Sequence, residues 1–152
     1  MDDEKIFPFR PDERFDLFAA TEPELDRFGA GAYVLLRARE GAFEYPTAHS
    51  RVFYIGESSR GGSRLATHRY HATRAKLQLG AGGPFSSYWW PRYGFAAAFG
   101  AEVWWFKAQD KYPPKKLESL LVDRFFWKCG ALPIGNGKWP NASFQDPNEE
   151  LE

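Results

Sequence analysis

Runs of apolar residues predict two strands in the first half of the chain. Residues 32–38 (AYVLLRA) and residues 51–55 (RVFYI) are rich in β-branched, aromatic and aliphatic side chains. The turn-rich residues 39–50 connect them. Strands that are close in sequence usually pair as an antiparallel hairpin, so we expect these two to be neighbours joined by a long loop. Gly56 interrupts the second run, and we expect this strand to end at Ile55.

Helical spacing of apolar residues predicts helices further along the chain. In residues 63–77 small and apolar residues recur at helical spacing behind Ser63, a candidate N-cap. Residues 113–128 form an amphipathic pattern that begins with proline and is followed by Cys129-Gly130. A shorter helix is expected after Thr21, because a capping threonine is followed by proline and two glutamates.

The remaining segments complete the predicted architecture. Residues 101–107 (AEVWWFK) favour a strand, residues 1–20 favour an irregular extension, and residues 84–100 fit no single element. The order strand–strand–helix–strand–helix predicts a small mixed α/β (α+β) fold with a sheet of about three strands flanked by helices. The expected division is an N-terminal extension with a short helix (1–30), one domain (31–140) and an acidic C-terminal tail (141–152).

Composition narrows the class of protein. The chain of 152 residues is long enough for one domain, and its 18% of aromatic residues predicts an aromatic core. The single cysteine, Cys129, excludes an internal disulfide. The N-terminus lacks the apolar stretch of a signal peptide, and the apolar residues 94–106 are too short to span a bilayer and contain Glu102. We therefore expect a cytoplasmic protein without a membrane partner.

The formal net charge of zero hides a strong segregation of charge. Residues 1–50 hold 6 Lys and Arg against 11 Asp and Glu, and residues 140–152 hold 4 acidic residues and no basic ones. Residues 51–139 hold 14 Lys and Arg against 5 Asp and Glu. A basic excess in one segment favours a polyanionic partner such as nucleic acid, although chance clustering with acidic, solubilising ends is the alternative.

Five short features stand in order along the predicted elements. They are Gly31-Ala32-Tyr33, Tyr54-Ile55-Gly56, Arg64 followed by His68, Glu118 in the last helix, and Asn136 after it. Together they resemble the GIY-YIG nuclease family over residues 31–138. The first motif departs from the family by having alanine in place of an apolar isoleucine. The connection 39–50 is longer than the family usually shows, which indicates either an insertion over the active site or a different first motif.

The resemblance implies an endonuclease that hydrolyses DNA with Mg²⁺ or Mn²⁺. The implied catalytic residues are Tyr33, Tyr54, Arg64, His68, Glu118 and Asn136. Glu118 would hold one divalent cation, which suits a hard metal that keeps several waters. Arg64 would neutralise the phosphate through its planar fork of donors. Tyr33 would act on the attacking water as a general base or as its orienter. A phenol with a pKa of about 10 needs a cationic neighbour to act as a base, and Arg64 and His68 are the candidates.

The other expected roles concern substrate contacts. Tyr54 would hydrogen-bond the phosphate or the water, and Asn136 would position the metal ligand or brace its loop. Five basic residues are candidates for contacts with the nucleic-acid backbone: Arg60, Arg69, Arg74, Lys76 and Lys138. Four aromatic residues are candidates either for base stacking or for the core: Tyr88, Trp89, Trp90 and Tyr93.

Two other functions remain open from the sequence. One is a nucleic-acid-binding module on the same fold with weak or no catalysis. The other is an interaction domain whose basic centre docks an acidic protein. DNA is favoured over RNA as the substrate because of the family that the motifs resemble.

Overall fold

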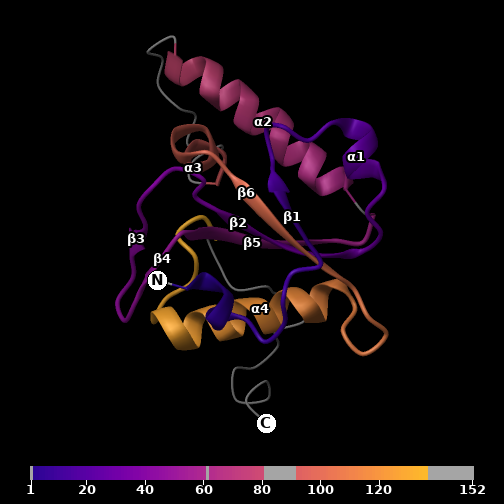
Figure 1. The fold of residues 1–152 in the computed structure, drawn as a ribbon, viewed down its shortest axis with the longest axis vertical. Helices are drawn as coiled ribbons and strands as arrows, with labels where there is room; N and C mark the ends of the chain where they lie inside the picture. Colours follow the sequence, from indigo (N-terminus) through magenta and orange to yellow (C-terminus); the bar gives the residue numbers. More distant parts are fainter. Residues whose placement is uncertain (1, 61, 81–91, 137–152) are drawn as a thin grey trace.

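An antiparallel sheet lies between two layers of helices in the computed structural model, which describes residues 2–60, 62–80 and 92–136 (Figure 1). The elements in chain order are η1 (Asp3–Ile6), β1 (Glu13–Asp16), α1 (Glu22–Asp26), β2 (Gly31–Leu36), β3 (Phe43–Glu44), β4 (His49–Ser50), β5 (Val52–Ser58), α2 (Ser63–Gly80), α3 (Arg92–Phe99), β6 (Glu102–Lys107) and α4 (Pro114–Cys129). Within the described ranges the main sheet has four strands, in the order β1-β6-β2-β5, and β3 pairs with β4 separately. The predicted mixed fold class is confirmed, and the sheet is one strand wider than expected.

The additional strand comes from residues 1–20, which the sequence predicted to be irregular. β1 pairs antiparallel with β6, with Phe15 opposite Val103. Asp12 N also donates to Trp105 O at 2.8 Å. A four-residue strand beside two prolines has no clear pattern of its own, and it forms because β6 offers its hydrogen-bonding edge.

The N-terminal turn is held to the sheet by a buried carboxylate. Asp3 is 4% exposed, accepts a hydrogen bond from Ser50 Oγ at 2.6 Å and pairs with Arg51 Nε at 3.2 Å. Arg51 also pairs with Glu102 at 3.1 Å. Because a buried charge is costly unless it is paired and hydrogen-bonded, this arrangement stabilises only one position of the N-terminus on the sheet.

The strands β2 and β5 form the predicted hairpin, with one difference in length. The structure corrects the expected end of the second strand at Ile55, because β5 continues through Gly56 to Ser58. Gly56 lies opposite Tyr33, and a Cβ on Gly56 would lie 2.6 Å from the Tyr33 hydroxyl. Glycine thus lets the tyrosine ring cross the neighbouring strand, and the pairing with β2 offsets the low strand propensity of glycine.

A bulge in this hairpin places two consecutive side chains on one face. Leu35 pairs with Tyr54 and Leu36 pairs with Val52, so Phe53 is an extra residue on β5. Phe53 belongs to the core on the α2 side of the sheet, and Tyr54 packs against the same core. The bulge therefore directs Tyr54 toward α2.

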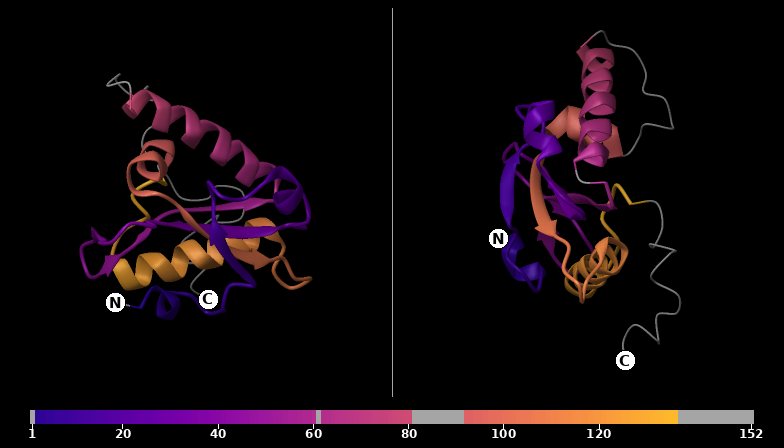
Figure 2. Two further views of the ribbon diagram at one scale, coloured as in Figure 1. Left: turned by 45° about the horizontal axis from the view of Figure 1, so that its top comes forward. Right: turned by 90° about the vertical axis from the view of Figure 1, so that its right-hand side faces the viewer.

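Each face of the sheet has its own apolar core. Helices α2 and α3 cover one face and α4 covers the other (Figure 2). Leu65 and Ala72 of α2 pack against Tyr33 and Leu35 on one face. On the other face α4 packs against the alternate residues of β2. β2 is buried along its whole length, which explains why its sequence reads as a continuous apolar run.

The helices follow the predicted start and stop signals closely. Thr21 caps α1 with Glu24 in a reciprocal capping box, and Gly130 ends α4 in the left-handed conformation at φ 80°. Ser63 is the first residue of α2 rather than its cap, since Gly62 precedes it and Gly62 O accepts from Ala66 N. In the part of the chain that the structure describes, no helix combines the length and apolarity needed to cross a bilayer.

The close contact between α1 and the start of α2 leaves no room for a side chain at Gly62. A Cβ on Gly62 would overlap the carbonyl group of Leu25, whereas a Cβ on the exposed Gly29 would meet nothing within 4 Å. We expect Gly62→Ala to lower the free energy of unfolding by about 1–3 kcal/mol, because the backbone of α1 must shift. We expect Gly29→Ala to be neutral or to stabilise by up to about 1 kcal/mol. Urea denaturation followed by tryptophan fluorescence measures both, and equal midpoints for the two variants would contradict the close contact.

Candidate functional site

A buried hydrogen bond joins the sheet to helix α2. The Tyr33 hydroxyl lies 2.8 Å from His68 Nε2, and the two side chains are 1% and 3% exposed. The ring of Tyr54 lies beside both, with centroid distances of 6.2 Å to Tyr33 and 5.1 Å to His68. Three of the residues predicted from the motifs are therefore in mutual contact, although they come from two strands and a helix.

Tyr33, Tyr54 and His68 form a tyrosine cluster, and two arginines from different helices exert an electrostatic effect on it. Arg64, in the first turn of α2, is exposed and exerts an electrostatic effect on Tyr33, Tyr54 and His68. Arg92, the first residue of α3, places its guanidinium 5.1 Å from the centroid of the Tyr54 ring. Its charge acts on the same three residues. The cluster thus carries positive charge at its border.

Burial keeps the cluster itself neutral. Desolvation raises the pKa of Tyr33 well above 10, and Arg64 opposes this rise only in part. Burial also raises the pKa of Tyr54, against the effect of Arg92. Burial, together with Arg92 and Arg64, lowers the pKa of His68 to about 3. At neutral pH, His68 is therefore uncharged, and the tautomer of its imidazole decides whether Nε2 accepts the hydrogen bond from the Tyr33 hydroxyl or donates it.

This electrostatic arrangement corrects one expectation from the sequence. His68 was a candidate cation that would lower the pKa of Tyr33, but a neutral imidazole supplies no charge. Arg64 does favour the ionised phenol, yet its effect is smaller than that of burial. Tyr33 is consequently a protonated hydrogen-bonding group at neutral pH and not a ready base.

Two carboxylates, Glu118 of α4 and Glu57 of β5, are close enough to interact electrostatically. Glu118 of α4 has its pKa raised to about 7, first by burial and then by the charge of Glu57 on β5. The positive charges of Arg64 and Lys115 lower the pKa of Glu118 and so oppose this rise. In the described part of the chain, Glu57 Oε2 is buried without a hydrogen-bond partner. Glu118 also raises the pKa of Tyr33 and of Tyr54, so its carboxylate lies in the same region of the molecule.

The carboxylate pair is the feature that suits a metal. The described residues contain no group of three or more His, Cys, Asp or Glu side chains that could hold an ion. Mg²⁺ is usually held through one or two carboxylates and several waters, so Glu118 with Glu57 provides a donor set of the appropriate kind. A divalent cation bound there would reduce the repulsion between the two carboxylates. It would also give the buried Glu57 oxygen a partner. The residues present therefore fit Mg²⁺ or Mn²⁺.

Asn136 braces the open edge of the sheet. Its Oδ1 accepts from Ile55 N at 2.9 Å, and its Nδ2 donates to Ile55 O at 2.8 Å. The side-chain amide thus occupies the place of a neighbouring strand beside β5. Of the two expected roles, this geometry agrees with bracing of the loop that follows α4.

A polar cleft of about 330 Å³ lies where β5 leads into α2. Its lining residues are Glu57, Ser58, Ser59, Arg60, Ser63, Arg64 and Thr67. Arg64 therefore borders both this cleft and the tyrosine cluster. The long connection 39–50 leaves β2 and enters β5 at the other end of the hairpin, so it does not cover this cleft.

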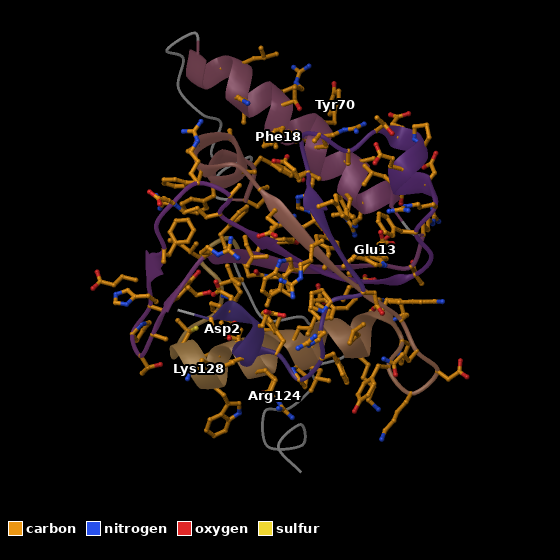
Figure 3. All side chains as sticks on the ribbon, in the orientation of Figure 1. Asp2, Glu13, Phe18, Tyr70, Arg124 and Lys128 are labelled. Carbon is orange, nitrogen blue, oxygen red and sulfur yellow. The ribbon has the colours of Figure 1, made fainter. Side chains whose placement is uncertain are left out.

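The other predicted basic contacts are scattered. Arg69 donates to Ala20 O and lies 4.0 Å from Glu22, so it is engaged with α1. Arg74 is exposed beside Tyr70, which projects outward from α2 (Figure 3). Lys76 lies 5.0 Å over the Phe18 ring. The structural positions of Lys138, Tyr88, Trp89 and Trp90 lie outside the described residues.

Glu57 and Arg92 were not found from the sequence, and the role of a third residue, Tyr93, was left open. Tyr93 was left open between stacking and core, and it is buried against His68 and His71. Glu57 directly follows the Tyr-Ile-Gly motif, which is a signal that was available. Arg92 lies in the segment that fitted no single element, so no local pattern placed it near Tyr54.

The buried state of His68 predicts a pH dependence of stability. Its pKa is about 3 in the folded protein and 6.5 in the unfolded chain, so the unfolded state binds the proton more tightly. Below pH 6.5, wild type should lose about 1.4 kcal/mol per pH unit relative to His68→Gln, until pH approaches 3. Urea titrations between pH 7 and 4 measure this difference. The matched control is His49→Gln, which removes an exposed histidine. Parallel profiles for wild type and His68→Gln would show that His68 is not buried in its neutral form.

Comparisons with known proteins identify no relative of this chain. No family model matches the chain, and neither the curated proteins nor the solved structures contain a match. The resemblance to the GIY-YIG family therefore remains a prediction from its motifs. The arguments for function rest on the contacts around β5.

Proposed function

We propose that this chain is a metal-dependent endonuclease that hydrolyses phosphodiester bonds of DNA, with a site of the GIY-YIG type. The observation that carries the proposal is the convergence of residues that are far apart in sequence. Tyr33, Tyr54 and His68 are in contact, and Arg64 and Glu118 act on both tyrosines. A phenol pair, a guanidinium and an acidic pair around one strand supply the groups that phosphodiester hydrolysis needs.

The roles follow from charge and exposure. Arg64 is exposed at the cleft and binds the phosphate, whose negative charge it neutralises. Tyr54 is only partly buried and donates its hydroxyl proton to a phosphate oxygen or to the attacking water. Tyr33, which stays protonated, orients this arrangement through its hydrogen bond to His68. Orientation is thus favoured over proton abstraction as the role of Tyr33 in the free protein.

Glu118, with Glu57 beside it, is the proposed holder of Mg²⁺ or Mn²⁺. A divalent cation bound there would supply positive charge to the oxygen that leaves when the phosphodiester bond breaks. Arg64 acts electrostatically on Glu118, so the phosphate-binding and cation-binding residues belong to one region. Arg64 would neutralise the phosphate while Glu118 and Glu57 hold the cation.

Nucleic acid is the proposed substrate because of the charge of α2 and its surroundings. The sequence of α2 contains Arg64, Arg69, Arg74 and Lys76 and no acidic residue. Of these residues Arg64 lines the cleft, where Arg60 joins it, and the two offer positive charge to a phosphate backbone. DNA is proposed over RNA on the motifs alone.

A binding module with weak or no catalysis is the second candidate. The observation that favours it is the burial of Tyr33, which is 1% exposed and holds its proton firmly. Such a protein would bind DNA with the same arginines and would leave the strand intact. The cleavage experiment below separates the two candidates.

We expect purified protein to nick plasmid DNA with Mg²⁺ or Mn²⁺ and to stop when the metal is chelated. Glu118→Gln and Arg64→Ala should each reduce the rate at least about 100-fold, because each removes charge that stabilises the transition state. Gel analysis of supercoiled plasmid measures the rate. The matched controls are Glu44→Gln, at an exposed carboxylate on β3, and Arg124→Ala, at an arginine that α4 carries away from the sheet (Figure 3).

Wild-type protein that binds DNA without nicking it would support the binding module. Wild-type rates in Glu118→Gln and Arg64→Ala would refute the assignment of the site. Urea denaturation of each variant establishes that the loss of activity is not a loss of folding.

A further inference from the structure

Arg92 is held at the site by aromatic rings and not by a carboxylate. Its guanidinium lies 5.1 Å from the Tyr54 ring centroid and 5.9 Å from that of Tyr93. Throughout the described residues, no Asp or Glu lies within ion-pair distance of it. Cation–π contacts use the face of the guanidinium and leave its in-plane N–H groups available for an anion.

The charge around Arg92 is not compensated by its described neighbours. Arg92 and Arg64 act together on Tyr33, Tyr54 and His68, so both guanidiniums border one small cluster. That cluster is neutral and buried, and its low polarity weakens the screening of their mutual repulsion. Glu57 lines the cleft together with Arg64, and Arg64 acts on Glu118, whereas no described carboxylate forms an ion pair with Arg92. An anion between the two guanidiniums would relieve this repulsion.

The position of α3 explains how Arg92 reaches the cluster. Phe95 and Ala96 of α3 belong to the core on the α2 side of the sheet, and Tyr93 packs against His68 at 5.3 Å. These contacts fix the first turn of α3 against α2 and β5. The side chain of Arg92 therefore starts from a rigid helix and reaches the face of Tyr54.

We propose that Arg92 is a further phosphate-binding residue of this site, which holds a backbone phosphate of the nucleic acid from the α3 side of Tyr54 while Arg64 holds it from the α2 side. This inference rests on the proposed function for its substrate class and adds a residue that the motifs do not contain. A nucleic-acid strand would then pass over Tyr54 with one phosphate held by Arg64 and Arg92. Charge and fork geometry both contribute, because an arginine binds phosphate through paired donors.

The test is the salt dependence of DNA binding, measured without cleavage. Fluorescence anisotropy with a labelled 20-base-pair duplex in Ca²⁺ gives Kd between 50 and 300 mM KCl for wild type and Arg92→Gln. Loss of one phosphate contact should reduce the slope of log Kd against log salt by about 0.9 and should weaken binding about tenfold at 0.1 M salt. Arg92→Lys retains the charge, so it should restore the slope while recovering only part of the affinity.

A control on the opposite side of the molecule separates this effect from general charge. Arg124→Gln removes a positive charge from the outward side of α4 and should leave the slope unchanged (Figure 3). An Arg92→Gln variant that matches wild type in slope and Kd would overturn the proposal. Weaker binding with an unchanged slope would also overturn it, since that is the result of a purely structural role.

The two proposals fail separately. If wild type binds the duplex in Ca²⁺ but does not cut plasmid in Mg²⁺, the nuclease function fails while the slope still tests Arg92. If wild type cuts DNA and Arg92→Gln keeps the wild-type slope, the nuclease function stands and the role of Arg92 fails. Absence of wild-type binding to this duplex overturns the role of Arg92 as stated.

Discussion

The buried hydrogen bond between Tyr33 and His68 is the contact on which the rest of the candidate site depends. It requires the Tyr33 ring to cross the neighbouring strand, and this crossing is possible because Gly56 has no side chain. Removing one partner of such a bond leaves a buried polar group without a partner, which costs about 1–3 kcal/mol. The bond therefore fixes the position of α2 relative to β2, and with it the direction in which Arg64 points.

The location of β5 at the edge of the sheet explains how residues from both faces can act together. Tyr54 packs on the α2 side, whereas Glu118 belongs to α4 on the other side. In the interior of a sheet the strands would separate these layers. At the edge they meet around β5, where the amide of Asn136 takes up the hydrogen-bonding groups of Ile55. Beside it, Gly135 N donates to Phe53 O at 2.6 Å, so the loop after α4 is fixed to β5 at two residues.

Positive and negative groups are arranged around this edge without neutralising one another completely. Burial, and then the charge of Glu57, raises the pKa of Glu118 to about 7. Arg92 and Arg64 act on a buried, neutral cluster and, after burial, lower the pKa of His68. Under the proposed function, a bound cation would offset the charge of the carboxylates and a bound phosphate would offset that of the arginines.

Short-range patterns in the sequence determined much of the fold. The capping box at Thr21, the continuous apolar run of β2 and the glycine after Cys129 each specify an element through residues that are neighbours along the chain. The order of the motifs also identified the tyrosines and His68 as candidates before their contacts were known. The predictions of the helix caps and of β2 were confirmed because helix caps and strand patterns depend mainly on local conformational preferences.

Contacts between residues that are distant in sequence decided the rest of the fold and the protonation states at the site. β1 exists because β6 offers it an edge, and β5 passes through Gly56 because Tyr33 needs the space. The neutral state of His68 and the raised pKa of Glu118 come from burial and from charges on other elements. Arg92 reaches Tyr54 because α3 packs against α2. The sequence by itself determined which residues were available for chemistry, and the tertiary structure decided which of them meet and in which protonation state, because burial and charge pairing depend on residues that are distant along the chain.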